Sequence, residues 1–302
     1  MQSHHGVTGK ASTRHSNPTM KLLIERGSCR SYLNKKIPAN ILEQVLKAGI
    51  HAPTGGNLQP YSIIKIENRA TNASLAKHCG QPFVGQAPVN LLFCIDWRRL
   101  ELWSKLSAAP FTANRSFRHF WISFQDTIIS AQNICTAADS LGLGCCYIGT
   151  VLEFFPALKK MFKLPLGVFP VVLLCLGYPK TKPVPRKKLP AKVMVHSERY
   201  RDLSGRELVK AFEDKYPGMK VAITPERLKD MERVCLKTGG PALAKRALAR
   251  IQKQGYINPA QRYFGLHYSA DYMPEGNDTY LKLMEKFGFH WFKKYFPYGK
   301  KA

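Results

Sequence analysis

The chain has 302 residues, 45% of them hydrophobic, which is enough for one large globular domain or for one domain with an extension. No apolar run approaches the roughly 20 residues that a membrane-spanning helix needs, which argues against an integral membrane protein. The 46 basic and 20 acidic residues give a formal net charge of +26, which attracts phosphates, nucleic acids and anionic membrane surfaces without specificity.

Residues 1–19 are predicted to be a disordered basic tail, because they contain no acidic residue and no hydrophobic stretch. The lack of a hydrophobic stretch argues against a secretory signal. A basic, acid-free leader is also compatible with an organellar transit peptide. We therefore expect a cytoplasmic protein and keep an organellar matrix as the alternative.

The first predicted elements after this tail are two helices and a strand. Asn17 and Pro18 form an N-cap and first-turn pair for a short helix that stops at Gly27. Residues 38–51 place their apolar side chains on one face of a second helix. A loop of small and polar residues, A-P-T-G-G-N-L-Q-P, leads into a strand at 61–67. Its small residues would let the backbone approach a flat or anionic ligand closely.

The middle of the chain mixes strands and helices without the regular βαβα rhythm of a doubly wound sheet. Apolar runs predict three strands, of which the first and third are central: 88–96, 145–151 and 170–179. A long, nearly all-apolar helix is predicted at 120–144 and should therefore be buried, and a shorter helix follows at 152–164. Residues 97–118 show no clear pattern. This order predicts an α+β fold.

Residues 196–302 are predicted to be a C-terminal, mainly helical extension. Thr224-Pro225 opens one helix that ends near Gly239-Gly240, and residues 241–255 predict a second. The last stretch, FGFHWFKKYFPYGKKA, is aromatic and basic, which suits a membrane surface or another protein. We favour the interpretation in which these aromatic side chains pack on the protein's own core.

The eight cysteines and nine histidines do not form a metal-binding pattern. No cysteine pair has the C-x-x-C spacing, Cys145 and Cys146 are adjacent, and no histidine pair has the H-x-x-x-H spacing. Most cysteines have apolar neighbours, which is typical of buried thiols in a reducing compartment. We expect no structural metal.

Several common binding motifs are absent from the sequence. It contains no G-x-x-x-x-G-K-[ST] phosphate loop and no complete dinucleotide fingerprint, so we expect no separate nicotinamide-binding domain. A serine nucleophile elbow, a zinc finger and an RNP-type aromatic motif are also absent. A nucleic acid or a membrane surface is compatible with the charge but is not favoured as a partner.

Two basic clusters indicate an anionic ligand. Arg26, Ser28 and Arg30 alternate after a predicted helix end, so in an extended segment their side chains share one face. Two guanidinium groups and a hydroxyl on one face suit a planar anion. Arg186 and Lys188 alternate in the same way between prolines. Either cluster alone is more simply explained as solvated charge on a turn.

Together these segments resemble the nitroreductase family of FMN-dependent oxidoreductases. The matching motifs, in order, are R-x-S-x-R at 26–30, A-P-T-G-G-N-L-Q-P at 52–60, G-L-G-C-C-Y-I-G-T at 142–150, L-P-L-G-V-F-P-V-V-L-L-C-L-G-Y-P at 164–179 and R-x-K-L-P at 186–190. The resemblance implies an FMN-binding domain at 20–195, followed by the extension 196–302 of unknown role. It also implies a mixed, mostly antiparallel sheet flanked by helices, and a homodimer with the flavin at its interface and a C-terminal segment that crosses to the partner.

The resemblance assigns the basic residues to the two ends of FMN. Arg26 would contact the phosphate, with Ser28 nearby, and Arg186 and Lys188 would close on the same group. Arg30 would lie by the pyrimidine edge of the ring, where a cation favours the reduced, anionic flavin.

The resemblance assigns the loop and the third motif to the flavin ring. The implied loop contacts, from the partner subunit, are Pro53, Thr54, Gly55, Asn57 and Gln59. The implied catalytic position is Gly149, whose backbone N–H would lie near flavin N5, with Thr150 beside it. Two positions depart from the family, since Gly27 stands where Arg or His is common and Tyr61 replaces the commoner Trp.

The activity implied is an NAD(P)H-dependent, ping-pong reduction of a small-molecule acceptor such as a nitroaromatic or a quinone. Arg115 and Arg118 are candidates for binding the nucleotide or an anionic substrate, and Phe117 for the acceptor pocket; plain surface charge and plain core are the alternatives. A different class of function stays open, because the net charge of +26 also suits a non-catalytic flavin-binding protein with a structural or RNA-associated role.

Overall fold

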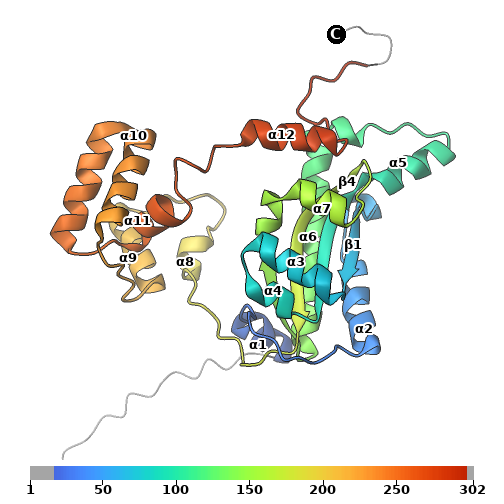
Figure 1. Cartoon of the computed structure of the whole chain (residues 1–302), viewed down its shortest axis with the longest axis horizontal. Coiled ribbons are helices and arrows are strands. Elements are labelled where there is room, and N and C mark those ends of the chain that lie inside the picture. Colours follow the sequence, from blue (N-terminus) through green and yellow to red (C-terminus); the bar gives the residue numbers. More distant parts are fainter. Residues whose placement is uncertain (1–16, 298–302) are drawn as a thin grey trace, which may run out of the picture. The chain divides into compact units, whose positions relative to one another are not determined.

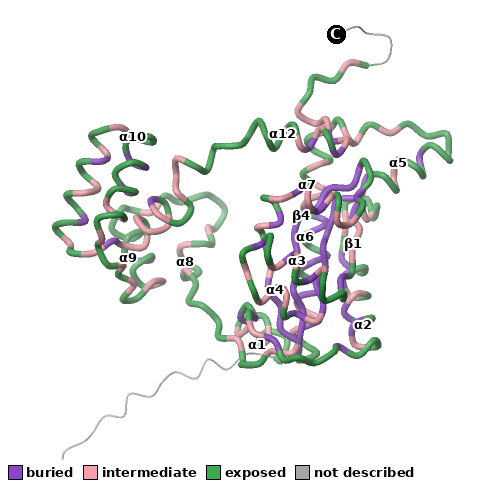
Figure 2. Tube along the Cα trace, in the orientation of Figure 1, coloured by how far each residue is buried: buried purple, intermediate pink, exposed green. Residues whose placement is uncertain are grey.

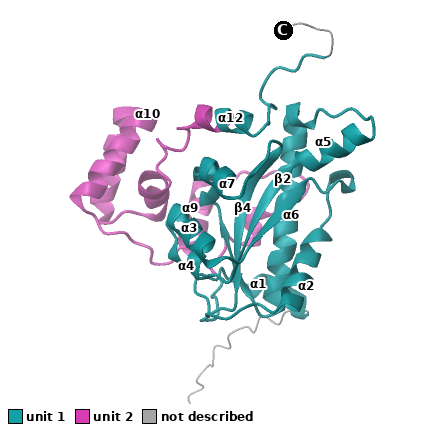
Figure 3. Cartoon of the chain, turned by 45° about the vertical axis from the view of Figure 1, so that its right-hand side comes forward, with its two compact units in different colours: residues 1–185, 281–302 teal, residues 186–280 magenta. Residues whose placement is uncertain are grey.

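The computed structural model describes residues 17–297, so that nearly all of the predicted basic tail lies outside the described residues (Figure 1). The chain divides into two compact units (Figure 3). The first unit comprises residues 1–185 and 281–302, and the second unit comprises residues 186–280. Among the described residues, no helix is long and apolar enough to cross a membrane.

The first unit is built on a four-stranded antiparallel sheet with the order β1-β2-β4-β3. The strands are β1 (Tyr61–Ile66), β2 (Val89–Asp96), β3 (Gly144–Ile148) and β4 (Val168–Gly177). Every residue of β2 and β4 is buried, and Figure 2 shows the buried residues at the centre of the sheet in purple. The prediction of two central strands and of an α+β fold is therefore confirmed.

The predicted helices of the first unit are present. They are α1 (Pro18–Glu25), α2 (Ala39–Ile50), α6 (Phe117–Ser140) and α7 (Phe155–Met161). Asn17 caps α1 by accepting a hydrogen bond from the backbone N–H of Met20. Helix α6 contacts all four strands. The prediction that this helix is buried is correct only in part, because several of its residues are buried but Trp121 and Ile129 are 52% and 39% exposed.

Three further helices of the first unit were not predicted, namely α3 (Arg69–Cys79), α4 (Pro82–Gln86) and α5 (Trp97–Leu106). Two of them, α3 and α5, begin at a polar side-chain cap, which apolar periodicity does not detect. Asn68 caps α3 and Asp96 caps α5, each by accepting a backbone N–H bond. Because α5 follows β2 directly, its cap is the last residue of the strand.

The C-terminal segment packs in the core of the first unit. After α12 (Asn277–Lys286), Phe287 and Phe289 are 1% and 0% exposed. Phe289 stacks on Trp97 with ring centroids 4.6 Å apart, and Phe287 lies 5.4 Å from Phe169. The favoured interpretation of the aromatic end is therefore confirmed for these two residues. The region 196–302 is not one body, because its last residues bury their rings in the first unit.

The second unit is helical, as predicted. It contains α8 (Ala191–Met194), α9 (Gly205–Lys215), α10 (Pro225–Gln254), α11 (Pro259–Gln261) and a π-helical turn (Arg262–His267). Helix α10 is kinked at Gly240, whose φ of 71° and ψ of −173° are not helical, and Pro241 follows. The two predicted helices are the two halves of α10. The small core of the second unit consists of Met231, Cys235, Ala244, Ile251 and Ile257.

Candidate functional site

The loop between α2 and β1 has an unusual backbone. It contains a 3-10 turn at Gly55–Asn57, and three of its residues have positive φ: 60° at Gly56, 56° at Asn57 and 49° at Gln59. Asn57 and Gln59 carry side chains in a conformation that costs of order 1 kcal/mol or more and that concentrates at functional sites. The predicted ligand loop is thus a strained segment that its surroundings must hold in place.

Buried Asp126 of α6 holds this loop. The backbone N–H of Gly55 donates to both carboxylate oxygens of Asp126, at 3.1 and 3.2 Å. A Cβ atom at Gly55 would lie 2.9 Å from Ile122 Cγ2, so the loop lies directly against α6. Burial raises the pKa of Asp126, and the bond from Gly55 partly offsets the effect of burial. Asp126 therefore fixes the position of the loop.

Some residues of this loop form hydrogen bonds that support the loop, and others are exposed to solvent. The Gln59 side-chain amide donates to the backbone oxygen of Ile50 at 2.9 Å, and its backbone N–H donates to Thr54 Oγ1 at 3.2 Å. Gln59 and Thr54 thus support the loop from within. Pro53 and Asn57 are exposed, and the Asn57 side chain has no hydrogen-bond partner among residues 17–297. These two residues are free to contact a ligand.

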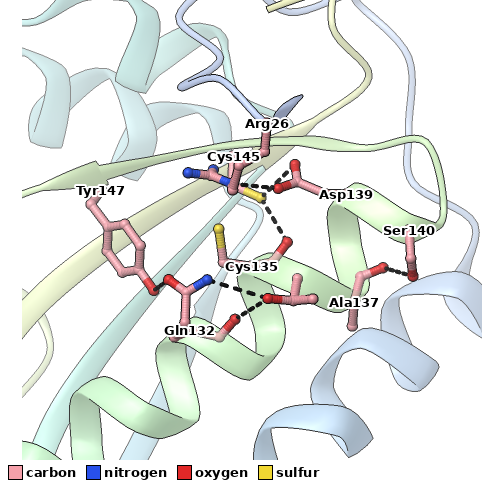
Figure 4. Close-up of polar contacts among 9 residues, drawn as sticks. Arg26, Gln132, Cys135, Ala137, Asp139, Ser140, Cys145 and Tyr147 are labelled. Atoms are coloured by element: carbon pink, nitrogen blue, oxygen red, sulfur yellow. Dashed lines mark hydrogen bonds and ion pairs between the residues drawn. The ribbon is translucent and has the colours of Figure 1, made fainter. Parts of the chain in front are cut away.

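Arg26 is oriented by a second acidic residue of α6. Its Nε donates to Asp139 Oδ2 at 2.7 Å, and the two side chains are 23% and 12% exposed (Figure 4). Burial opposes the charged guanidinium, but the bond to Asp139 together with the nearby negative charges of Asp139, Cys135 and Cys145 outweighs it and raises the pKa of Arg26. In the described part of the chain neither terminal nitrogen of Arg26 has a hydrogen-bond partner. The guanidinium is held at one edge and free at the other.

The segment after Arg26 alternates as predicted. Ser28 and Arg30 are exposed, whereas Gly27 and Cys29 are buried. The backbone N–H of Cys29 donates to the Cys145 oxygen at the start of β3, at 2.9 Å. This bond aligns the segment with the sheet.

Gly27 has a structural reason for departing from the family pattern. A Cβ atom there would lie 2.7 Å from the backbone oxygen of Val184, so no larger residue has room. Val184 is close to the end of the first unit, and Arg186 and Lys188 follow it as the first residues of the second unit. Their approach to a phosphate at Arg26 stays a prediction.

Gly149 lies at the far end of β3 from this segment. Four residues of extended strand, about 13 Å, separate it from Cys145. Gly149 is exposed, and a Cβ atom added there would have no neighbour within 4 Å, so the space above its backbone is open. Thr150 begins the next 3-10 turn (Thr150–Glu153) and accepts a bond from Gln81 Nε2 at 3.2 Å.

The candidate substrate residues lie at the start of α6. Arg115, in a 3-10 turn (Ala113–Arg115), faces the ring of Tyr295 at 6.0 Å, and Arg118 is exposed. Phe117 is 54% exposed and lies 5.2 Å from the ring of Trp291. Ile122, which touches the loop at Gly55, is five residues or about 7.5 Å along the helix from Phe117. The three residues are therefore near the ligand loop without contacting it.

Two grooves in the first unit involve none of the predicted flavin residues. One, of about 510 Å³, is lined mainly by apolar residues of α5 and β4 and the segment before β4. The other, of about 800 Å³, lies between α2 and β1. The predicted flavin residues instead lie on exposed surface or beside it.

Sequence reasoning missed Asp126 and Asp139, which position the two predicted ligand segments. A signal was present, because these are the two acidic residues in the otherwise apolar stretch 120–144. A charged residue in a buried helix is retained only when it is paired, so each one predicts a partner. The identity of the partners, Gly55 and Arg26, was not available from the sequence.

Comparisons with known proteins identify the family of this chain. The sequence pattern described as the Nitroreductase family matches residues 23–178. An oxygen-insensitive NADPH nitroreductase of Salmonella typhimurium is 32% identical over 195 residues, which are 64% of this chain and 79% of that protein. An FMN reductase [NAD(P)H] of Bacillus subtilis is 30% identical over 186 residues, 61% of this chain and 75% of that protein.

A solved structure shows the same fold. The NADPH:FMN oxidoreductase from Vibrio harveyi, complexed with NAD+, is 28% identical and superposes with a TM-score of 0.62. The match covers 66% of this chain and 84% of the Vibrio chain. Part of this chain therefore has no counterpart in that structure.

Proposed function

The chain belongs to the nitroreductase family of oxidoreductases, and we propose that it binds FMN, oxidises NAD(P)H and reduces a small organic acceptor of the nitroaromatic or quinone type in a ping-pong cycle. The names of its relatives support NAD(P)H as the electron donor and FMN as the flavin, since these names include NADPH, NAD(P)H and FMN. Family membership favours an enzyme over the non-catalytic flavin protein that the charge alone would allow.

The observation that carries the proposal is the pairing of α6 with both predicted flavin segments. Asp139 holds Arg26, and Asp126 holds Gly55. Each acid is largely buried, and each positions a group that the family resemblance assigns to FMN. Such support of a binding group by a fixed neighbour is what a preorganised site requires.

The donor set suits a flavin phosphate. Arg26 offers its two terminal nitrogens, Ser28 offers a hydroxyl, and Arg30 adds a second exposed guanidinium. Charge-assisted bonds from guanidinium groups to a phosphate dianion are short and strong. Arg186 and Lys188 would add to this set. These groups therefore match a phosphate in charge and in hydrogen-bond donors, because cations and a hydroxyl lie on one exposed segment.

The remaining residues suit the ring. Bound FMN would supply the two-electron chemistry that no side chain here provides. Gly149 offers an unobstructed backbone to the reactive edge, and Thr150 is anchored beside it. Pro53 and Asn57 present the exposed side of the loop to one face of the ring, and Thr54, Gly55 and Gln59 keep the loop in that shape.

We further propose that the active form is a homodimer. In one chain the predicted flavin residues line neither groove, which is expected if a second copy completes the site. Large apolar side chains are exposed on α2, on α6 and in the loop, with Ile50 at 54%, Trp121 at 52% and Leu58 at 46%. Exposed apolar surface of this kind next to a binding segment is typical of an interface.

The test is spectroscopic. The purified protein should contain flavin, lose its visible absorbance when NADPH or NADH is added without oxygen, and regain it with a quinone or a nitroaromatic. Arg26→Ala should lower the flavin content at least tenfold, whereas Arg206→Ala, at an exposed position of the second unit, should not. Flavin that resists both nucleotides would contradict the activity, and full flavin in the Arg26 variant would contradict the assignment of the phosphate.

RNA binding is a second candidate property, supported by one observation. The chain has no acidic residue between Glu232 and Asp271. The second half of α10 exposes four cations that form no ion pair with the described residues: Lys245, Arg246, Arg250 and Lys253. A steep loss of RNA affinity with salt, reduced when these four are replaced by Gln, would support it. Equal affinity in the fourfold variant would exclude this surface.

A further inference from the structure

Three potential metal ligands converge beside Arg26. Cys135 and Asp139 are one turn apart on α6, and Cys145 lies opposite them on β3 (Figure 4). Their ligand atoms all lie within 4.8 Å of one another. Both cysteines are 0% exposed, and the Asp139 side chain is 12% exposed. These groups are therefore gathered at one point that is shielded from bulk water and open only at the edge of Asp139.

We propose that Cys135, Asp139 and Cys145 bind a thiophilic divalent cation of the Zn²⁺ type. Two thiolate sulfurs and one carboxylate oxygen are a donor set that Zn²⁺ accepts and that Mg²⁺ and Ca²⁺ do not favour. The cysteine spacing belongs to no common zinc motif, so the sequence predicted no metal. The site exists only because β3 returns alongside α6.

The measured separations suit such an ion. Bonds of about 2.3 Å to sulfur and about 2.0 Å to oxygen at tetrahedral angles place a sulfur and an oxygen about 3.5 Å apart, and two sulfurs about 3.8 Å apart. Cys145 Sγ lies 3.6 Å from Asp139 Oδ1. One edge of the tetrahedron is thus already formed, and the sulfur of Cys135 needs a shift of at most about 1.3 Å, which a change of side-chain torsion can supply.

Arg26 balances the charge of the bound site. Two thiolates and a carboxylate carry three negative charges, and a divalent cation with the guanidinium of Arg26 carries three positive charges. The buried cluster is therefore neutral, which avoids the cost of an uncompensated buried charge. Arg26 bonds to Oδ2 of Asp139 and leaves Oδ1 turned to Cys145. It would orient the ligand carboxylate from outside the coordination sphere.

Binding must release protons. In the metal-free form Cys145 Sγ is placed to donate a hydrogen to the Cys135 backbone oxygen at 3.5 Å or to Asp139 at 3.6 Å. When the cation binds, two metal–sulfur bonds form, and for each thiol that is still protonated one S–H bond breaks and one proton enters the solvent. No oxidant or reductant is needed.

The test uses Co²⁺ as a spectroscopic probe of the full-length, reduced, chelator-treated protein. We expect one Co²⁺ per chain, with an intense near-ultraviolet thiolate-to-cobalt band and the visible bands of tetrahedral cobalt, all displaced by Zn²⁺. Cys135→Ser and Cys145→Ser should each remove about half of the thiolate band, and the double variant all of it. Cys235→Ser, in the small core of the second unit, should leave the band unchanged.

A second measurement does not depend on variants. Wild-type protein in weakly buffered solution with a pH indicator should release protons as Zn²⁺ binds. Arg26→Gln should weaken Zn²⁺ binding by about 10- to 100-fold, as expected for a group that orients a ligand from outside the coordination sphere. The proposal is overturned if the wild type gives no thiolate band or if the double variant keeps it. None of these outcomes depends on FMN or on activity.

Discussion

The two units of this chain use acidic residues in different ways. In the first unit Asp126 and Asp139 lie in a mostly apolar helix, and each holds a distant segment of backbone or side chain. In the second unit most ion pairs lie between exposed side chains, as for Lys210 and Asp214 at 2.7 Å, although the Asp271 side chain, which pairs with Arg233 and Lys237, is only 4% exposed. Exposed pairs contribute little to stability, whereas removal of a buried partner leaves the other group unsatisfied. Asp126 and Asp139 thus position a site in the first unit, whereas most paired acidic residues of the second unit lie at its surface.

The two units also differ in the size of the hydrophobic core that stabilises each of them. The core of the first unit extends over the whole sheet and includes the rings of Phe287 and Phe289. The core of the second unit is a small cluster around α10. A large core buries a larger share of its surface, while a small one depends on a few residues and on backbone geometry. Most of the predictions below compare a position in the first unit with one in the second.

The largest effect is expected where the C-terminal segment enters the core of the first unit. Phe289→Ala removes a fully buried ring that stacks on Trp97, and we expect a loss of about 3–5 kcal/mol in the free energy of unfolding. Denaturant unfolding of the full chain measures it. Tyr295→Ala, at a position 50% exposed, is the control and should change little. Equal effects of the two variants would show that the C-terminal segment does not belong to this core.

Next comes the support of Arg26. Asp139→Asn removes the charge partner of a guanidinium whose side chain is 23% exposed, and we expect a loss of about 1–3 kcal/mol together with about tenfold weaker flavin binding. Asp214→Asn, in an exposed pair of the second unit, should leave both quantities unchanged. If the two variants behave alike, the proposed difference between Asp139, which positions Arg26, and the exposed Asp214 is wrong.

A smaller effect is expected at the kink of α10. Gly240 has a φ of 71° with an extended ψ, a conformation that other residues avoid, so Gly240→Ala should cost about 1–2 kcal/mol in the second unit. Gly205→Ala, where the added Cβ meets no neighbour, is the matched control. Hydrogen exchange resolved along α10 would measure the change. Exchange that accelerates equally in β2 would show that the units do not respond separately.

The smallest effect is a change in pH dependence. Burial raises the pKa of Asp126 above its ordinary value of 3.8. The native state then binds this proton more tightly than the unfolded chain does, so this group is most favourable at low pH and its contribution declines as pH rises from 3.8 through the higher native pKa. Asp126→Asn should flatten the stability profile in that window. Asp202→Asn, exposed in the second unit, is the control, and an unchanged slope in the Asp126 variant would contradict the assignment.

Much of the local structure could be predicted because its signals lie close together in the chain. The pair Asn17-Pro18 predicts the start of α1, and the pair Gly239-Gly240 predicts the interruption in α10. The apolar runs predict β2 and β4. Helix α5 was missed because its cap, Asp96, is also the last residue of a strand. The boundary predicted at 195/196 falls inside the second unit, since compactness depends on contacts and not on where a motif ends.

The predicted site was a set of segments whose mutual placement was unknown. The R-x-S-x-R and A-P-T-G-G-N-L-Q-P motifs carried a family resemblance that the comparisons confirm, although the role of each residue stays a prediction. The sequence did not reveal that α6 holds both motifs, nor that Gln59 is occupied within its own loop.

By itself, the sequence determined the strands, several of the helices, the fold class and the family, because backbone propensity, apolar periodicity and short motifs act between residues a few positions apart. Only the tertiary structure decided which distant groups meet. It paired Arg26 with Asp139 across 113 positions and Gly55 with Asp126 across 71, and it brought the two thiols of α6 and β3 together. The physical reason is that side-chain packing between elements sets these contacts, and a linear pattern does not encode the face that each element turns to its neighbour.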